Sequence, residues 1–103
     1  MIYRVERTIP SENDLDGILN YILFKLMNRK AAADLLAQYE EKLLILRETP
    51  YLYGLSHNEC LAQKGYHQFD FGNYIAFYTI DDISRVVYIV RIFYKKQDYE
   101  NLL

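Results

Sequence analysis

Three segments in the last third of the chain decide the fold: GYH at residues 65–67, FGNYIAFY at residues 71–78 and VRIFYKKQDYE at residues 90–100. Aromatic and β-branched residues dominate all three, which is typical of strands. Gly72-Asn73 and Asp81-Asp82 separate the segments with residues that favour tight turns. Because short turns join antiparallel neighbours, this region predicts three successive antiparallel strands, at residues 60–70, 73–80 and 85–94.

The last of these strands is apolar on both faces. In a regular strand, Val86, Tyr88, Val90 and Ile92 point to one face, and Val87, Ile89 and Phe93 point to the other. A strand that is buried on both faces lies inside a sheet. We therefore expect a central position for residues 85–94, and we expect the first strand of the chain to pair inside the sheet with one of the later strands.

Upstream, the chain predicts a first strand and a first helix. Residues 2–8 are rich in β-formers, and Pro10 ends this strand. Ser11 followed three residues later by Asp14 fits a capping box at a helix start. Apolar residues then recur on one helical face, so the first helix is expected to run to about Met27.

A second helix follows at once. Asn28 is suited to cap it, and Pro50 stops it. The loop at residues 51–59 then leads to the three strands. A short connection between two helices favours an antiparallel hairpin whose apolar stripes lie on a sheet. The predicted fold class is α+β, in the order β-α-α-β-β-β, with an antiparallel helical hairpin packed on a small, mainly antiparallel sheet; the 103 residues are expected to form one domain.

Composition limits the possible classes of function. The net charge of -2 argues against a protein that gains its affinity by covering many nucleic-acid phosphates. A local cationic patch is still possible, because residues 83–97 contain four basic residues and no acid. No signal-like or membrane-spanning apolar run occurs, so we expect a cytoplasmic protein without a membrane partner.

Metal and cofactor chemistry lack support in the sequence. His57 and the single cysteine, Cys60, are the only pair with metal-ligand spacing, and a zinc site needs a second pair. There is no Gly-rich phosphate loop and no motif for Ser-His-Asp or Cys-His catalysis. We therefore expect neither a metal nor an organic cofactor.

A few residues could nevertheless carry chemistry. His67 is suited to move protons near neutral pH, although the alternative is a strand residue bonded to a neighbour. Tyr94, Lys95 and Lys96 crowd the end of the last strand, where cations could stabilise charge on an attacked phosphate; the alternative is an exposed polar tail. Arg91 interrupts an apolar strand, so its head must reach water or a partner such as an acid of the helical hairpin.

The order of these segments along the whole chain resembles that of the RelE/ParE superfamily of toxins from type II toxin-antitoxin, or plasmid stabilisation, modules. The resemblance implies a compact toxin that arrests growth until a cognate antitoxin binds it. Relatives of the RelE type cut mRNA on the ribosome, as metal-independent endoribonucleases, and relatives of the ParE type inhibit DNA gyrase. Neither type needs a cofactor, and the resemblance leaves both targets open.

The resemblance also suggests site residues. The family commonly has basic residues where this chain has His67, Phe69, Ile75 and Gln97, so a decayed, non-toxic homologue that only binds antitoxin or regulates transcription is the alternative function. For an active toxin, the expected catalytic residues are His67, Tyr94 and Lys96. The expected RNA- or target-binding residues are Lys64, Tyr66, Arg91, Lys95, Gln97 and Tyr99.

Overall fold

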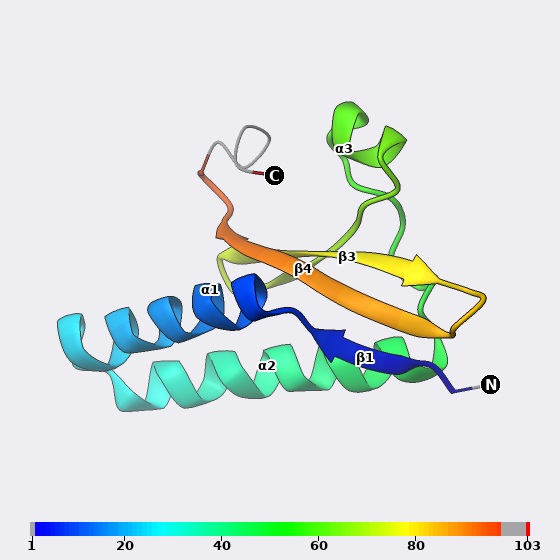
Figure 1. Ribbon diagram of the computed structural model, residues 1–103. Helices are drawn as coiled ribbons and strands as arrows, with labels where there is room; N and C mark the ends of the chain where they lie inside the picture. The colour runs from blue at the N-terminus through cyan, green and yellow to red at the C-terminus, as the bar shows by residue number, and fades with distance from the viewer. Residues whose placement is uncertain (1, 98–102) are drawn as a thin grey trace.

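A computed structural model describes residues 2–97 and 103 of the chain. A helical hairpin covers one face of a four-stranded sheet, and a short helix lies over the other face (Figure 1). The elements are β1 (Arg4–Arg7), α1 (Ile9–Asn20), the π-helix η1 (Tyr21–Lys25), α2 (Arg29–Glu48), α3 (Glu59–Gln63), β2 (His67–Phe71), β3 (Tyr74–Asp81) and β4 (Val86–Tyr94). The predicted α+β class with a helical hairpin on a mainly antiparallel sheet is confirmed.

The strands lie in the order β1-β4-β3-β2. β4 is therefore internal, as its two apolar faces predicted, and it pairs antiparallel with β3 and parallel with β1. The first strand pairs with a later strand as expected, but it lies at the edge of the sheet. Within the described residues, no helix is long and apolar enough to cross a membrane.

A β-bulge in β4 changes which side chains face the helices. Arg91 pairs with Phe77 and Ile89 pairs with Tyr78, so Val90 has no partner residue on β3. The bulge shifts the alternation by one residue. Ile92 therefore joins Val87 and Ile89 in the helix-side core, and Phe93 packs on the other face. The regular alternation expected for this strand was wrong from Val90 onward.

The first helix begins earlier than predicted, because Thr8 and not Ser11 is the N-cap. The Thr8 hydroxyl accepts a hydrogen bond from the Ser11 amide at 3.4 Å and lies 2.7 Å from the Ile89 carbonyl oxygen, to which it donates. Pro10 fits inside the first turn, where its missing N–H would have had no helical partner. Asp14 is not part of a capping box; its carboxylate contacts β4 instead.

The junction between the two helices is not a regular turn. α1 ends at Asn20 and the chain continues as η1 to Lys25, close to the predicted end of the helix. Met27 then takes a positive φ of 51°. The Asn28 side chain accepts a hydrogen bond from the Ala31 amide at 3.0 Å, which confirms it as the cap of α2, and α2 ends two residues before Pro50.

One predicted strand was partly wrong. Residues 59–63 form the helix α3, capped by Asn58, and strand β2 begins only at His67. The helix is favoured because it buries Leu61 completely against Ile75, Phe77 and Phe93 on the sheet face opposite the hairpin. A short helix with one buried apolar residue has no periodicity that sequence could reveal.

We expect Gly72→Ala to lower the free energy of unfolding by about 1–2 kcal/mol. Gly72 has a φ of +58°, and a Cβ added there would lie 2.8 Å from Cδ1 of the buried Leu35. Gly17→Ala is the matched control, because a Cβ at this helical position meets nothing within 4 Å. This substitution should raise the free energy of unfolding by about 0.5–1 kcal/mol. Urea denaturation of both variants measures the difference; equal midpoints would contradict the steric argument.

Candidate functional site

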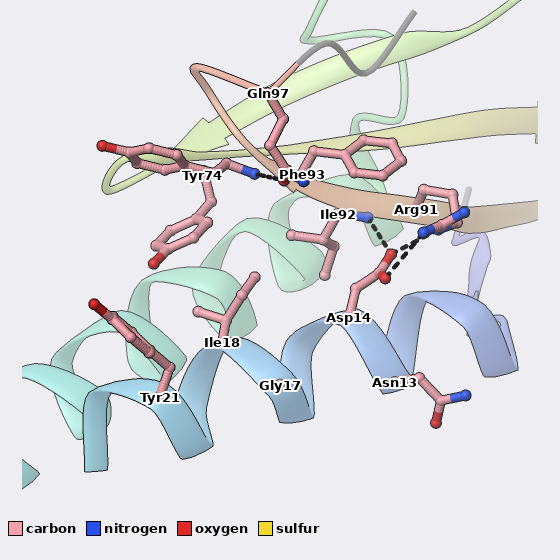
Figure 2. A pocket seen from close by; sticks show the side chains of 11 residues that line it. Asn13, Asp14, Gly17, Ile18, Tyr21, Tyr74, Arg91, Ile92, Phe93 and Gln97 are labelled. Carbon is pink, nitrogen blue, oxygen red and sulfur yellow. Dashed lines mark hydrogen bonds and ion pairs between the residues drawn. The ribbon is translucent and has the colours of Figure 1, made fainter. Parts of the chain in front are cut away.

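A groove of about 510 Å³ lies between α1 and the end of β4 (Figure 2). β1 ends opposite Ile89, and beyond that point α1 packs beside β4. The lining side chains are mainly aromatic or apolar, with one acid and one base at the floor. They are Asn13, Asp14, Gly17, Ile18, Tyr21, Tyr74, Arg91, Ile92, Phe93, Tyr94 and Gln97.

An ion pair closes the floor of this groove. The Asp14 carboxylate accepts hydrogen bonds from Nε and Nη2 of Arg91 at 2.8 and 3.2 Å, and from the Ile92 backbone amide at 2.9 Å. The hydrogen bond from Arg91 to Asp14 raises the pKa of the guanidinium. The expectation that Arg91 needs water or an acid of the hairpin is thus confirmed, and Asp14 supplies the acid.

Three tyrosines form the walls of the groove. The rings of Tyr74 and Tyr94 lie 5.7 Å apart, and Tyr21 faces them from the helix. Burial raises the pKa of the Tyr74 hydroxyl, and the neighbouring hydroxyls of Tyr94 and Tyr21 raise it further. Tyr74 is therefore neutral at physiological pH, where it offers an apolar face and a hydrogen-bonding hydroxyl.

The tail folds back at the open end of β4. The Gln97 side chain accepts a hydrogen bond from the Tyr94 amide at 2.8 Å, and the Gln97 amide donates to the Tyr94 carbonyl at 2.9 Å. Lys95 donates its backbone amide to Asn73 and places Nζ 3.3 Å from Asp70. Lys96 is exposed. Tyr94 and Gln97 therefore line the groove, and Lys95 and Lys96 lie between them in the chain.

His67 lies in a different part of the sheet. Its Nδ1 is 3.1 Å from the Tyr53 carbonyl oxygen, and its ring stacks on Tyr78 with centroids 5.3 Å apart. His67 pairs with Tyr78 and Tyr94 pairs with Tyr74, which is four residues away along β3. At about 3.3 Å per residue, the two side chains are separated by about 13 Å along the strand direction.

The remaining predicted residues are divided between two regions. Arg91 and Gln97 line the groove. Lys64 lies at the end of α3 and Tyr66 packs edge-on against Phe77, with ring centroids 6.5 Å apart, on the opposite face of the sheet. Tyr99 lies outside the described residues.

Sequence reasoning selected Arg91, Tyr94 and Gln97 and missed the other groove residues, including Asp14, Tyr21 and Tyr74. Asp14 was interpreted as part of a helix cap, and Tyr21 and Tyr74 were not distinguished from the other tyrosines. An acid on the apolar side of a predicted helix, combined with an arginine in an apolar strand, was the available signal for Asp14. Tyr21 and Tyr74 become neighbours only through the packing of η1 beside the β2–β3 turn, which sequence does not reveal.

The sequence matches the family described as ParE toxin of type II toxin-antitoxin system, parDE, over residues 5–99. The chain therefore belongs to this family, and it is a toxin of the RelE/ParE superfamily. A search of curated proteins finds no match.

Solved structures of the superfamily share the fold. The RelBE2 toxin-antitoxin complex from Mycobacterium tuberculosis matches with a TM-score of 0.63 and 23% identity, over 91% of this chain and 99% of that chain. The chromosomal ParDE system from P. aeruginosa matches with a TM-score of 0.71 and 16% identity, over 90% and 96% of the two chains. A free mutant of the E. coli toxin RelE matches with a TM-score of 0.67 and 12% identity, over 99% and 93%.

Proposed function

We propose that this toxin arrests growth by inhibiting DNA gyrase in the cytoplasm, through surface contacts and not through catalysis. The observation that carries the proposal is the separation of His67 from Tyr94, two of the residues with the chemistry for RNA cleavage. His67 lies about 13 Å along the strand direction from Tyr94. Groups that share one proton transfer must lie within hydrogen-bond reach of the same substrate atoms, at about 3 Å.

The charges of the site support the same conclusion. Arg91 is held by two hydrogen bonds to Asp14, and Lys95 lies beside Asp70. Lys96 is thus the one cation at this edge of the groove without an acidic neighbour among the described residues. A developing phosphorane needs positioned positive charge, which this arrangement supplies poorly. In this proposal Tyr94, Lys95, Lys96 and Gln97 contact the target protein.

The experiment compares the two targets directly. Purified, antitoxin-free protein is added to gyrase with relaxed plasmid, and separately to a reconstituted translation reaction in which new mRNA 5′ ends are mapped by primer extension. We expect loss of supercoiling and intact message. Ribosome-dependent cuts with normal supercoiling would overturn the proposal in favour of an mRNA endoribonuclease.

We also propose a cognate antitoxin as the partner that neutralises this toxin. The solved relatives from M. tuberculosis and Pyrococcus horikoshii are toxin-antitoxin complexes, which supports this partner class. Expression of the chain alone is expected to stop growth, and co-expression with its antitoxin is expected to restore it. Normal growth despite abundant folded protein would instead indicate the decayed homologue.

A further inference from the structure

Strand β1 lies at the edge of the sheet and has an unpaired outer side (Figure 1). The amides of Arg4 and Thr8 donate hydrogen bonds to the β4 side, at 2.9 and 3.2 Å. Because the backbone groups of successive strand residues point to alternate sides, those of Val5 and Arg7 point away from β4. In the part of the chain that the structure describes, no hydrogen bond reaches the Val5 amide or carbonyl. The outer side of β1 can therefore accept another strand.

Open space borders this side of β1. Two hollows, of about 290 and 410 Å³, are each lined by Val5 together with Arg47 of α2. Leu44 of α2 lines the first hollow and Ile2 lines the second, and both side chains are exposed. None of these residues lines the groove between α1 and β4. The edge of β1 is thus a separate surface with apolar side chains beside an unpaired backbone.

The charges of β1 select the strand that it can accept. Arg4 and Glu6 point to the same face of the strand, where Nε of Arg4 lies 2.8 Å from Oε1 of Glu6, and both side chains are exposed. Charged side chains on an edge strand usually oppose pairing with another chain. Here the two charges have opposite signs, so they favour an antiparallel partner with an acid opposite Arg4 and a base opposite Glu6. A second copy of β1 has this pattern.

One register of two antiparallel β1 strands satisfies both the backbone and the charges. When Val5 lies opposite Val5 of the second copy, the two residues exchange both of their N–H···O=C hydrogen bonds. Arg4 then lies opposite Glu6 of the second copy, and Glu6 lies opposite its Arg4. The two nearest registers that keep the outward backbone groups paired place Arg4 opposite Arg4, or Glu6 opposite Glu6. Like charges directly opposite one another destabilise a strand pair, so both of these registers are disfavoured.

We propose that two copies of this chain associate through β1, antiparallel about a twofold axis at Val5, so that their sheets become continuous. The interface is isologous, because each copy contributes the same strand. Arg4 and Glu6 of the two copies form a cluster of four charges with alternating signs. Each copy keeps its groove between α1 and β4 open, since the two surfaces share no lining residue. The proposal does not depend on which cellular process the toxin inhibits.

The test is analytical ultracentrifugation of the purified, antitoxin-free protein over a range of concentrations. We expect a reversible equilibrium between monomer and dimer. Arg4→Glu and Glu6→Arg each place like charges at both cross-strand pairs, so each should weaken the dimer about tenfold. The double variant Arg4→Glu/Glu6→Arg exchanges the two charges and should associate like the wild type. An equimolar mixture of the two single variants should associate more tightly than either variant alone, because every cross-strand pair again joins opposite charges.

The matched control is Arg29→Glu, which reverses an exposed cation at the start of α2 that lines neither hollow beside β1. It should dimerise with wild-type affinity. Because all the substituted side chains are exposed, circular dichroism should show that every variant keeps the fold. A protein that stays monomeric at every concentration would overturn the proposal. So would a dimer that the single reversals leave intact, a double variant that does not regain association, or an equal loss in the control.

Discussion

Asp14→Ala is expected to lower the free energy of unfolding by about 3 kcal/mol at neutral pH. The substitution removes three hydrogen bonds, two of them from the Arg91 guanidinium and one from the Ile92 amide. A charge-assisted hydrogen bond of this kind contributes about 1.5–3 kcal/mol to stability. A partly buried cation left without its partner adds a desolvation cost. The side chains of Asp14 and Arg91 are 18% and 32% exposed, so solvent screens the loss only in part.

Asp14 also accepts a hydrogen bond from the Ile92 amide, so its loss should have a larger effect than the loss of the ion pair alone. Arg91→Leu removes the guanidinium but leaves Asp14 bonded to the backbone, so it should destabilise the protein less than Asp14→Ala does. Asp16→Ala, at an exposed position of the same helix, should change stability by less than about 0.5 kcal/mol. Urea denaturation of the variants and of the double variant gives the coupling energy. If Arg91→Leu were less stable than Asp14→Ala, the hydrogen bond from the Ile92 amide to Asp14 would contribute little to stability.

The start of α1 shows why the fold and the site could be predicted from the sequence only in part. Apolar runs and turn residues predicted the bounds of β3 and β4 closely, because a hairpin depends on local sequence. The start of α1 was missed because Thr8 and Ser11 both carry a capping hydroxyl. The choice falls to Thr8 because its hydroxyl also reaches the Ile89 carbonyl on a strand about eighty residues away, and no local pattern contains that information.

The pairing register of the strands was the second feature that the sequence could not reveal. The bulge at Val90 is not visible in an apolar run, yet it decides that Ile92 faces the hairpin and that Phe93 faces α3. Register likewise separates His67 from Tyr94, because His67 pairs with Tyr78 and Tyr94 pairs with Tyr74. The residues grouped correctly, Tyr94 to Gln97, are consecutive in the chain, so their proximity required no knowledge of pairing.

Alkaline pH is expected to unfold the protein through its buried tyrosines. Burial raises the pKa of the Tyr39 hydroxyl to about 12, against about 10 in an unfolded chain. Because the folded pKa is the higher one, the stabilisation is complete below pH 10 and is lost as the pH rises from about 10 to 12. Two pKa units correspond to about 2–3 kcal/mol, and Tyr78, whose pKa burial also raises, adds to the loss.

Tyr39→Phe tests this directly, because it keeps the ring between Phe69 and Phe71 and removes the ionisable group. The unfolding free energy from urea denaturation, measured between pH 7 and pH 11.5, should fall less steeply above pH 10 in this variant than in the wild type. Parallel curves for the wild type and Tyr39→Phe would mean that other groups cause alkaline unfolding. A flatter curve would show that ionisation of Tyr39, which packs from α2 against Phe69 and Phe71, contributes to alkaline unfolding.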